Sequence, residues 1–196
     1  MQQRTVILVC TAATLIGAAL WLNLGGTHGA YQVQPLNATE VAELPANLDS
    51  DLRLIEVLRS RCGREPGDWK NLPGAAKTAY VTLWAEEVHR TMSWSQLAAS
   101  EMVDGEYPTF SDIASAYDDM NCPETAAGVR AMASPFTQVV TSYQAWFENA
   151  RNNKAGPPPP TKALDVASRD AFAHLDSVRP RRLDYIRAHV QDLGVR

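Results

Sequence analysis

Hydrophobic residues form one long, nearly unbroken run close to the N-terminus. Residues 5–24 hold no charged side chain, and Arg4 is the only side-chain charge before them. A helix of about 20 residues is roughly 30 Å long, enough to cross the hydrocarbon core of a bilayer. Because no further charge appears until Glu40, the position of Arg4 predicts a cytoplasmic N-terminus and an exported remainder. Residues 1–24 are therefore expected to be a membrane anchor.

A cleavable signal sequence is the alternative for this segment, and it would leave a secreted protein. The small residues Gly17, Ala18 and Ala19 suit a cleavage site. The apolar run continues beyond them to Leu24, which is longer than a signal sequence needs and favours the anchor. Residues 25–48 contain glycines and prolines but few large apolar side chains, a composition typical of a linker.

From residue 49 onward, apolar residues recur at the spacing of amphipathic helices, and no stretch shows the alternation of a strand. The pattern predicts an all-α bundle of about seven helices over residues 49–196. Ser93 and Gln96 have the spacing of a capping box at a helix start. Helices are expected to begin near residues 49, 73, 94, 109, 123, 135, 161 and 180.

Besides the start at Pro73, which suits a first helical turn, three of these starts rest on a proline within a helical pattern. Pro123, Pro135 and Pro180 each interrupt a helical pattern, and each is expected to begin a new helix. Proline fits the first helical turn, where its missing N–H costs nothing, but it disrupts a helix interior.

Charge is unevenly distributed along the chain. The net charge of −4 argues against a nucleic-acid-binding protein, which is usually basic. Residues 86–148 nevertheless contain ten acidic residues against Arg90 and Arg130, whereas residues 151–196 contain nine basic and five acidic residues. An acidic face balanced by a basic C-terminal region is one interpretation. The other is an acidic surface that attracts a basic partner.

Two of the three cysteines, Cys62 and Cys122, lie outside the apolar run. An exported location is oxidising, so this pair predicts a disulfide. The alternative is two small buried side chains at a helix end and a helix start.

The segment from Leu83 to Met102 concentrates unusual residues where two expected helices join. It contains two of the five tryptophans, an acidic pair and one of the four histidines. Together with an acidic pair further along the chain, it supplies our candidate interaction residues. These are Glu86, Glu87, His89, Arg90, Trp94, Gln96, Asp118 and Asp119.

Glu86 and His89 have the Glu-x-x-His spacing of di-iron helical bundles, which places both side chains on one helix face. Such a centre needs a second copy of the motif, and none of the other histidines follows a glutamate at this spacing. The chain also lacks the nucleophile, phosphate-loop and thiol-redox motifs of common enzymes. We therefore expect no metal, no cofactor and no enzymatic activity.

Residues 69–193 resemble the DNA-mimic-protein-like family, a domain family of unknown function. Glu87-Val88 resembles the end of a family helix, and residues 94–97 (Trp-Ser-Gln-Leu) resemble an aromatic-x-Gln segment. Residues 171–176 and 183–189 are similar to its C-terminal helices. Where the family has Asn-Asn-Gly-Gly, this chain has residues 89–92, His-Arg-Thr-Met. The resemblance implies an all-helical domain but no shared activity, because DNA mimicry belongs to the namesake.

These observations predict a membrane-tethered, exported helical domain that binds another protein through its acidic middle section. One alternative is an acidic DNA-mimic-type regulator of a DNA-binding protein, which would need access to the cytoplasm. The other is an uncharacterised enzyme or metal-binding bundle built on Glu86 and His89.

Overall fold

The computed structural model describes residues 36–62, 67–100, 107–154 and 156–193. Every regular element in these ranges is a helix and none is a strand, which confirms the expected all-α fold. The predicted membrane-spanning run of residues 5–24 lies outside them. Among the described helices, none combines the length and apolar character that crossing a membrane requires.

Eight α-helices and two short 3-10 helices make up the described structure. They are α2 (Ala38–Glu43), α3 (Leu48–Cys62), η1 (Asp68–Asn71), α4 (Gly74–Thr91), α5 (Trp94–Ala99), α6 (Phe110–Asp119), α7 (Pro123–Arg151), α8 (Lys162–Ala171), α9 (Leu175–Ala188) and η2 (Val190–Leu193).

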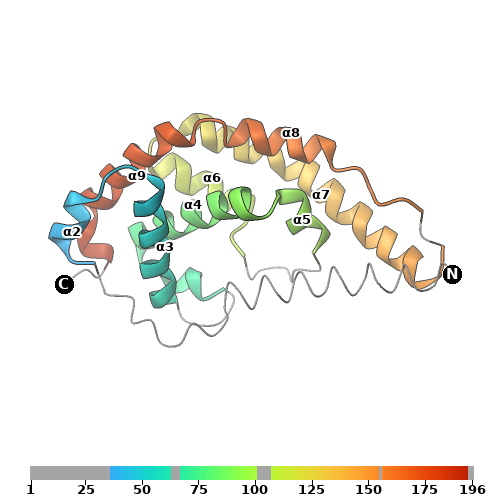
Figure 1. Cartoon of the computed structure of the whole chain (residues 1–196), viewed down its shortest axis with the longest axis horizontal. Helices are drawn as coiled ribbons and strands as arrows, with labels where there is room; N and C mark the ends of the chain where they lie inside the picture. Colours follow the sequence, from blue (N-terminus) through green and yellow to red (C-terminus); the bar gives the residue numbers. More distant parts are fainter. Residues whose placement is uncertain (1–35, 63–66, 101–106, 155, 194–196) are drawn as a thin grey trace.

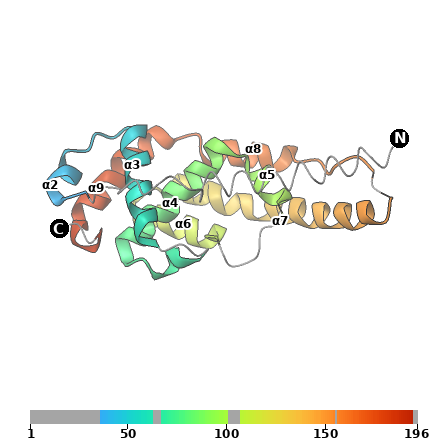
Figure 2. The ribbon, with the colours of Figure 1, turned by 60° about the horizontal axis from the view of Figure 1, so that its bottom comes forward.

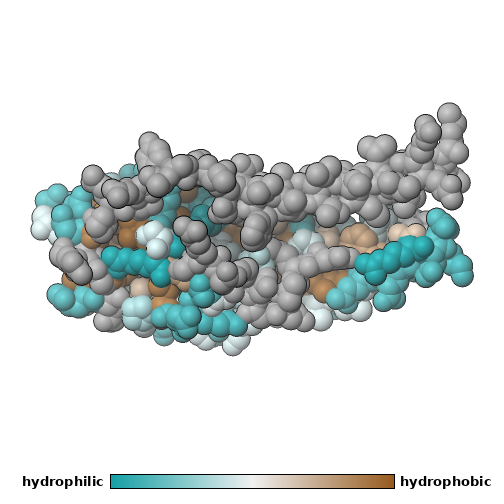
Figure 3. Space-filling model, turned by 90° about the horizontal axis from the view of Figure 1, so that it is seen from below, coloured by the Kyte–Doolittle hydropathy of each residue, from teal (hydrophilic) through white to brown (hydrophobic). Residues whose placement is uncertain are grey.

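The helices form an elongated bundle in which α7 is the longest member. α8 lies along α7, and α5 and α6 also pack on it (Figure 1). At the end of the molecule away from the last turns of α7, α2, α3 and α9 lie together around one end of α4 (Figure 2). The last turns of α7 extend beyond α5 and α6, and Figure 3 shows hydrophilic residues gathered at this free end.

Helix α4 is the centre of the bundle because it contacts α3, α5, α6 and α9. Its sequence is apolar or small on most sides, as expected for a helix surrounded by others. Ala79 and Ala85 are fully buried, and Thr82 satisfies its hydroxyl within the helix by donating to the carbonyl oxygens of Thr78 and Ala79.

The capping side chains predicted at Ser93 and Thr109 are confirmed, whereas α3 begins at Leu48, before the expected cap at residue 49, and Thr161 makes no capping bond through its side chain. Ser93 Oγ accepts a hydrogen bond from the Gln96 amide at 3.1 Å, and Gln96 Oε1 accepts one from the Ser93 amide at 2.9 Å. Thr109 and Asp112 form the same reciprocal pair at the start of α6. These bonds satisfy N–H groups that a helix terminus otherwise leaves unpaired.

Two of the three proline predictions were wrong. Pro123 begins α7 as expected, but Pro135 lies inside the same helix and Pro180 lies inside α9. In each helix, buried residues lie both before and after the proline. In α7 these include Met132 and Val139. Packing of a continuous apolar face therefore offsets the one backbone hydrogen bond that proline removes.

The described part of the expected linker belongs to the bundle. Leu36, Val41 and Leu44 are buried in the core, and α2 between them begins with a capping box. Arg187 of α9 donates to the carbonyl oxygen of Leu44 at 2.8 Å. The segment has few large apolar side chains, which is why its composition suggested a linker. The three that it has between residues 36 and 44 are nevertheless buried in the core.

Gly128 offers a test of the α7–α8 packing. A Cβ atom at this position would lie 2.7 Å from Ala171 Cα. Helix propensity alone predicts that Gly128→Ala stabilises the protein by about 1 kcal/mol. We expect a net loss of about 1–3 kcal/mol in the free energy of unfolding, measured with urea, because backbone atoms cannot yield like a flexible side chain. Gly156→Ala is the control, since nothing lies within 4 Å of its added Cβ. Stabilisation by Gly128→Ala would contradict the close packing.

Candidate functional site

Glu86, the first candidate interaction residue, lies inside the bundle on α4. Only 3% of the residue is exposed, and its carboxylate faces Arg182 of α9, which is fully buried. Arg182 donates from Nη1 to Oε1 at 2.6 Å and from Nη2 to Oε2 at 3.1 Å. The two bonds form a forked pair between guanidinium and carboxylate, the strongest common type of ion pair.

Two other helices join this pair. Asp51 of α3 accepts from Arg182 Nη2 at 2.9 Å and from Arg179 Nε at 3.0 Å. Tyr117 of α6 donates its hydroxyl to Glu86 Oε1 at 3.0 Å. Asp51, Glu86, Tyr117, Arg179 and Arg182, here called the Arg182 network, therefore connect α3, α4, α6 and α9.

The electrostatics of the network favour the charged guanidinium. Burial alone would lower the pKa of Arg182, but the charge and hydrogen bonds of Glu86, with Asp51, raise it above its ordinary value. Burial and the Glu86 carboxylate raise the pKa of Tyr117, which keeps its hydroxyl a donor. Glu86 is thus fully engaged inside the fold and does not face an outside partner.

Glu87 takes part in a separate contact between α3 and α4. It forms an ion pair with Arg59, which links α4 to the end of α3. The neighbouring Tyr80 has its pKa raised to about 12, mainly by burial and then by Cys62. Glu87 is only partly exposed, and its carboxylate is engaged in the ion pair with Arg59.

His89 packs against α8 at the end of α4. Its Nδ1 lies 3.1 Å from Ser168 Oγ, and its ring stacks on Phe172 with 4.7 Å between ring centroids. Burial lowers the pKa of His89, against a weaker raising effect of Glu86. A histidine beside a serine hydroxyl can accept its proton, but Ser168 is only 5% exposed and lies mid-helix. The contact with Ser168 and the stacking on Phe172 fix the orientation of the imidazole.

Trp94 is a core residue with 2% exposure. Its indole packs edge-on to Trp84 at 6.0 Å and parallel to Phe172 at 6.0 Å, and it also contacts Phe110 and Phe136. Its Nε1 has no hydrogen-bond acceptor among the described residues. Its role is therefore packing between α4, α5, α7 and α8.

The remaining candidates lie at the surface. Arg90 is exposed at the end of α4, and Gln96 is used in the cap of α5. Asp118 and Asp119 are exposed at the end of α6, where Asp118 pairs with Arg130 of α7. Asp119 Oδ2 accepts from the Thr78 hydroxyl at 3.2 Å. The eight candidates thus divide between the interior and separate parts of the surface and do not converge on one cavity.

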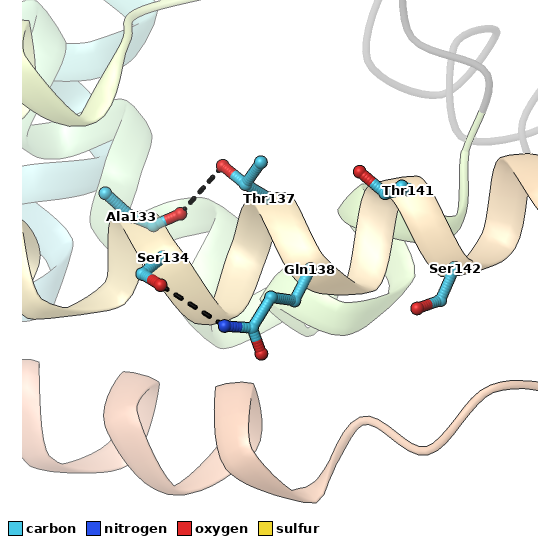
Figure 4. A pocket seen from close by; sticks show the side chains of 6 residues that line it. All are labelled: Ala133, Ser134, Thr137, Gln138, Thr141 and Ser142. Atoms are coloured by element: carbon cyan, nitrogen blue, oxygen red, sulfur yellow. Dashed lines mark hydrogen bonds between the residues drawn. The ribbon is translucent and has the colours of Figure 1, made fainter.

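A shallow hollow of about 670 Å³ lies along α7 and is open to solvent (Figure 4). Thr137 Oγ1 bonds to the carbonyl oxygen of Ala133, and Gln138 bonds to Ser134, so these polar groups serve the helix itself. None of the described residues that line the hollow is ionisable. The lining residues are Ala133, Ser134, Thr137, Gln138, Thr141 and Ser142.

Metal binding has little support from the arrangement of the described side chains. They contain no cluster of three or more His, Cys, Asp or Glu that could hold an ion. Glu86 is bonded to Arg182 and His89 to Ser168, so the two members of the Glu-x-x-His spacing face different partners.

The disulfide expected between Cys62 and Cys122 is not formed, and both thiols are free. Burial, followed by the charge of Asp68, raises the pKa of Cys62 to about 11 at the end of α3. Cys122 precedes α7, where its thiol donates to the carbonyl oxygen of Met120 at 3.6 Å. Cys62 ends α3 and Cys122 precedes α7, so the two cysteines lie at a helix end and a helix start, as the alternative to a disulfide proposed.

Sequence reasoning missed the Arg182 network although a signal was present. Residues 179–182, Arg-Pro-Arg-Arg, look like a solvent-exposed basic cluster. Arg182, however, is four residues from both Val178 and Ile186, which are buried, so helical spacing places it on the apolar face. Asp51 likewise lies three residues before Leu54 and four before Ile55, both buried in α3.

Comparisons with known proteins do not assign the chain to a family. No protein-family model matches it, and neither the curated proteins nor the solved structures contain a match.

The environment of His89 predicts a pH dependence. Because burial lowers the pKa of His89, the folded chain keeps the ring neutral at pH values where the unfolded chain protonates it. The resulting stability is present above the ordinary pKa of about 6.5 and is lost as pH falls through the lowered value. We expect urea unfolding from about pH 7 to pH 5 to show a steeper loss in the wild type than in His89→Gln. His174→Gln, at an exposed position, should follow the wild type. Equal slopes for wild type and His89→Gln would contradict this prediction.

Proposed function

We propose that the chain is a membrane-tethered, exported protein-interaction module rather than an enzyme. The tether is the apolar run of residues 5–24. The interacting surface is the outer side of α6 together with the start of α7, here called the acidic corner. It comprises Asp112, Asp118, Asp119 and Glu124, all of which are exposed.

The exposure of these four carboxylates is the observation that supports the proposal. Glu86 and Glu87, in the segment with the highest density of unusual residues, are instead engaged with Arg182 and Arg59. Four exposed carboxylates of the acidic middle section therefore lie on α6 and the first turn of α7. Asp118 shares its charge with Arg130 in an exposed ion pair, and such pairs are weak enough to exchange for a partner's cation.

Helix α6 presents this surface rigidly. Ile113, Ala114, Ala116 and Tyr117 are buried on its inner side, and Thr109 caps its start. A helix fixed along one face holds the opposite face in a defined orientation, which lowers the entropy lost on binding. A basic protein surface is the matching partner, because complementary charge favours encounter and correct orientation.

The resemblance to the DNA-mimic-protein-like family supports a second candidate partner for the same surface. In it, the acidic corner binds the DNA-binding face of a basic protein. This version requires the domain to lie in the cytoplasm, the opposite of the orientation that Arg4 favours. A reporter fused after Arg196 separates the two, since its activity depends on the compartment.

Site-specific photocrosslinking in cells tests the acidic corner. Ser115 is exposed on the same helix, so a photoreactive residue there should yield a discrete protein adduct. We expect the adduct to weaken at high salt, which screens exposed charges, and to weaken in the triple variant Asp118→Asn, Asp119→Asn and Glu124→Gln. The control position is Ser177, which is exposed on α9. An adduct that persists in the triple variant, or that forms equally from Ser177, would contradict the proposal.

A further inference from the structure

The inner face of α7 continues past the helices that cover most of it. Tyr143, Trp146 and Phe147 follow the buried Val139 at the spacing of a single helix face. They lie on the last turns of α7, which extend beyond α5 and α6, and each is only partly buried (Figure 1). Tyr143 packs at the edge of the hydrophobic core, and Trp146 and Phe147 pack beside it with ring centroids 5.1 Å apart. These three residues, here called the aromatic end, form an apolar surface away from the centre of the bundle.

Trp146 is held in one orientation. Its Nε1 donates a hydrogen bond to the carbonyl oxygen of Gly156 at 2.9 Å, and its ring lies edge-on to Tyr143 at 6.2 Å. The polar edge of the indole is therefore satisfied within the protein, while part of the ring is left exposed. Tryptophan and tyrosine rings of this amphipathic kind gather where lipid headgroups meet acyl chains.

The charge near the aromatic end is positive. Between residues 141 and 163, the bases Arg151, Lys154 and Lys162 stand against Glu148 alone, and all four side chains are exposed. The net charge of this stretch is +2, whereas the whole chain carries −4. The acidic corner, on α6 and the start of α7, has the opposite sign. A surface of anionic headgroups therefore attracts the aromatic end and repels the acidic corner.

The length of the tether limits how the domain can approach a bilayer. Residues 25–35 separate the apolar run from Leu36, and eleven residues span at most about 40 Å. Helix α7 has 29 residues and is therefore about 44 Å long. Helix α2, which follows Leu36, lies at the opposite end of the molecule from the last turns of α7 (Figures 1 and 2). The aromatic end can thus reach the membrane only when α7 is inclined toward the bilayer plane and not upright.

We propose that the aromatic end rests on the anionic lipid surface of the membrane that holds the chain. Tyr143, Trp146 and Phe147 enter the headgroup layer, and the three neighbouring bases contact lipid phosphates. Helix α7 then lies along the membrane, and repulsion keeps the acidic corner off the lipid and open to a partner. This inference rests on the proposed tether and adds to it a defined orientation of the domain.

Quenching of tryptophan fluorescence by brominated lipid tests this contact in the full chain, reconstituted into vesicles. The background variant is Trp21→Phe, which removes the tryptophan of the apolar run. Of the four tryptophans left, Trp69, Trp84 and Trp94 are buried in the core, so only Trp146 can meet the lipid. With about 30% phosphatidylglycerol, brominated acyl chains should lower the emission by up to about a quarter. Trp146→Phe should abolish this loss, and vesicles of phosphatidylcholine alone should reduce it by about half or more.

Charge variants test the basic residues of the same surface. The combined changes Arg151→Gln, Lys154→Gln and Lys162→Gln should reduce the quenching of Trp146 by about half or more. The matched control combines Lys70→Gln, Arg90→Gln and Arg169→Gln, which removes three exposed bases from other parts of the surface. It should leave the quenching unchanged, because the net charge of the chain is altered equally in the two variants.

Flotation of the vesicles separates this inference from the tether on which it rests. A chain that does not float with the vesicles contradicts the tether and, with it, the lipid contact. A chain that floats without quenching of Trp146, or with equal quenching in the two triple variants, overturns the lipid contact alone. Circular dichroism of each variant should show unchanged helix content. Photocrosslinking from Ser115 should persist in Trp146→Phe, so the acidic corner is tested separately.

Discussion

The buried guanidinium of Arg182 is the interaction on which the bundle depends. Removing a charge from water costs several kcal/mol, and this cost is recovered only when other buried groups compensate the charge with good geometry. Here the compensation comes from Glu86 on α4, Asp51 on α3 and, through Glu86, Tyr117 on α6. Because these groups lie far apart in the sequence, the network can form only when α3, α4, α6 and α9 are all correctly placed.

The same packing holds Glu86, His89 and Trp94 in contacts inside the bundle. The segment around Glu86 has the residue types of an active site, but its side chains are turned inward, to Arg182, to Ser168 and into the packing of Trp94. The proposed acidic corner lies instead on α6, whose inner face is fixed by Ile113, Ala114, Ala116 and Tyr117.

The sequence predicted the helices well because apolar spacing and capping side chains act locally, as at Ser93 and Thr109. It failed where a tertiary contact outweighed a local preference. Pro135 and Pro180 stay inside helices because buried faces continue past them, and Leu36 joins a core that composition does not reveal. The partners of Glu86 were out of reach for another reason. Arg182 is 96 positions away, and local spacing shows that it is buried without showing what it faces.

A double-mutant cycle at Glu86 and Arg182 measures the central interaction most directly. The free energy of unfolding would be determined for the wild type, Glu86→Gln, Arg182→Met and the double variant. We predict that Arg182→Met alone costs about 3–5 kcal/mol, because it leaves the buried Glu86 carboxylate without a cation and leaves Asp51 with Arg179 alone. The double variant should cost less than the sum of the two single changes, with a coupling of roughly 1–3 kcal/mol. Single costs below about 1 kcal/mol that simply add would show that the pair is not buried and coupled, and would contradict this account.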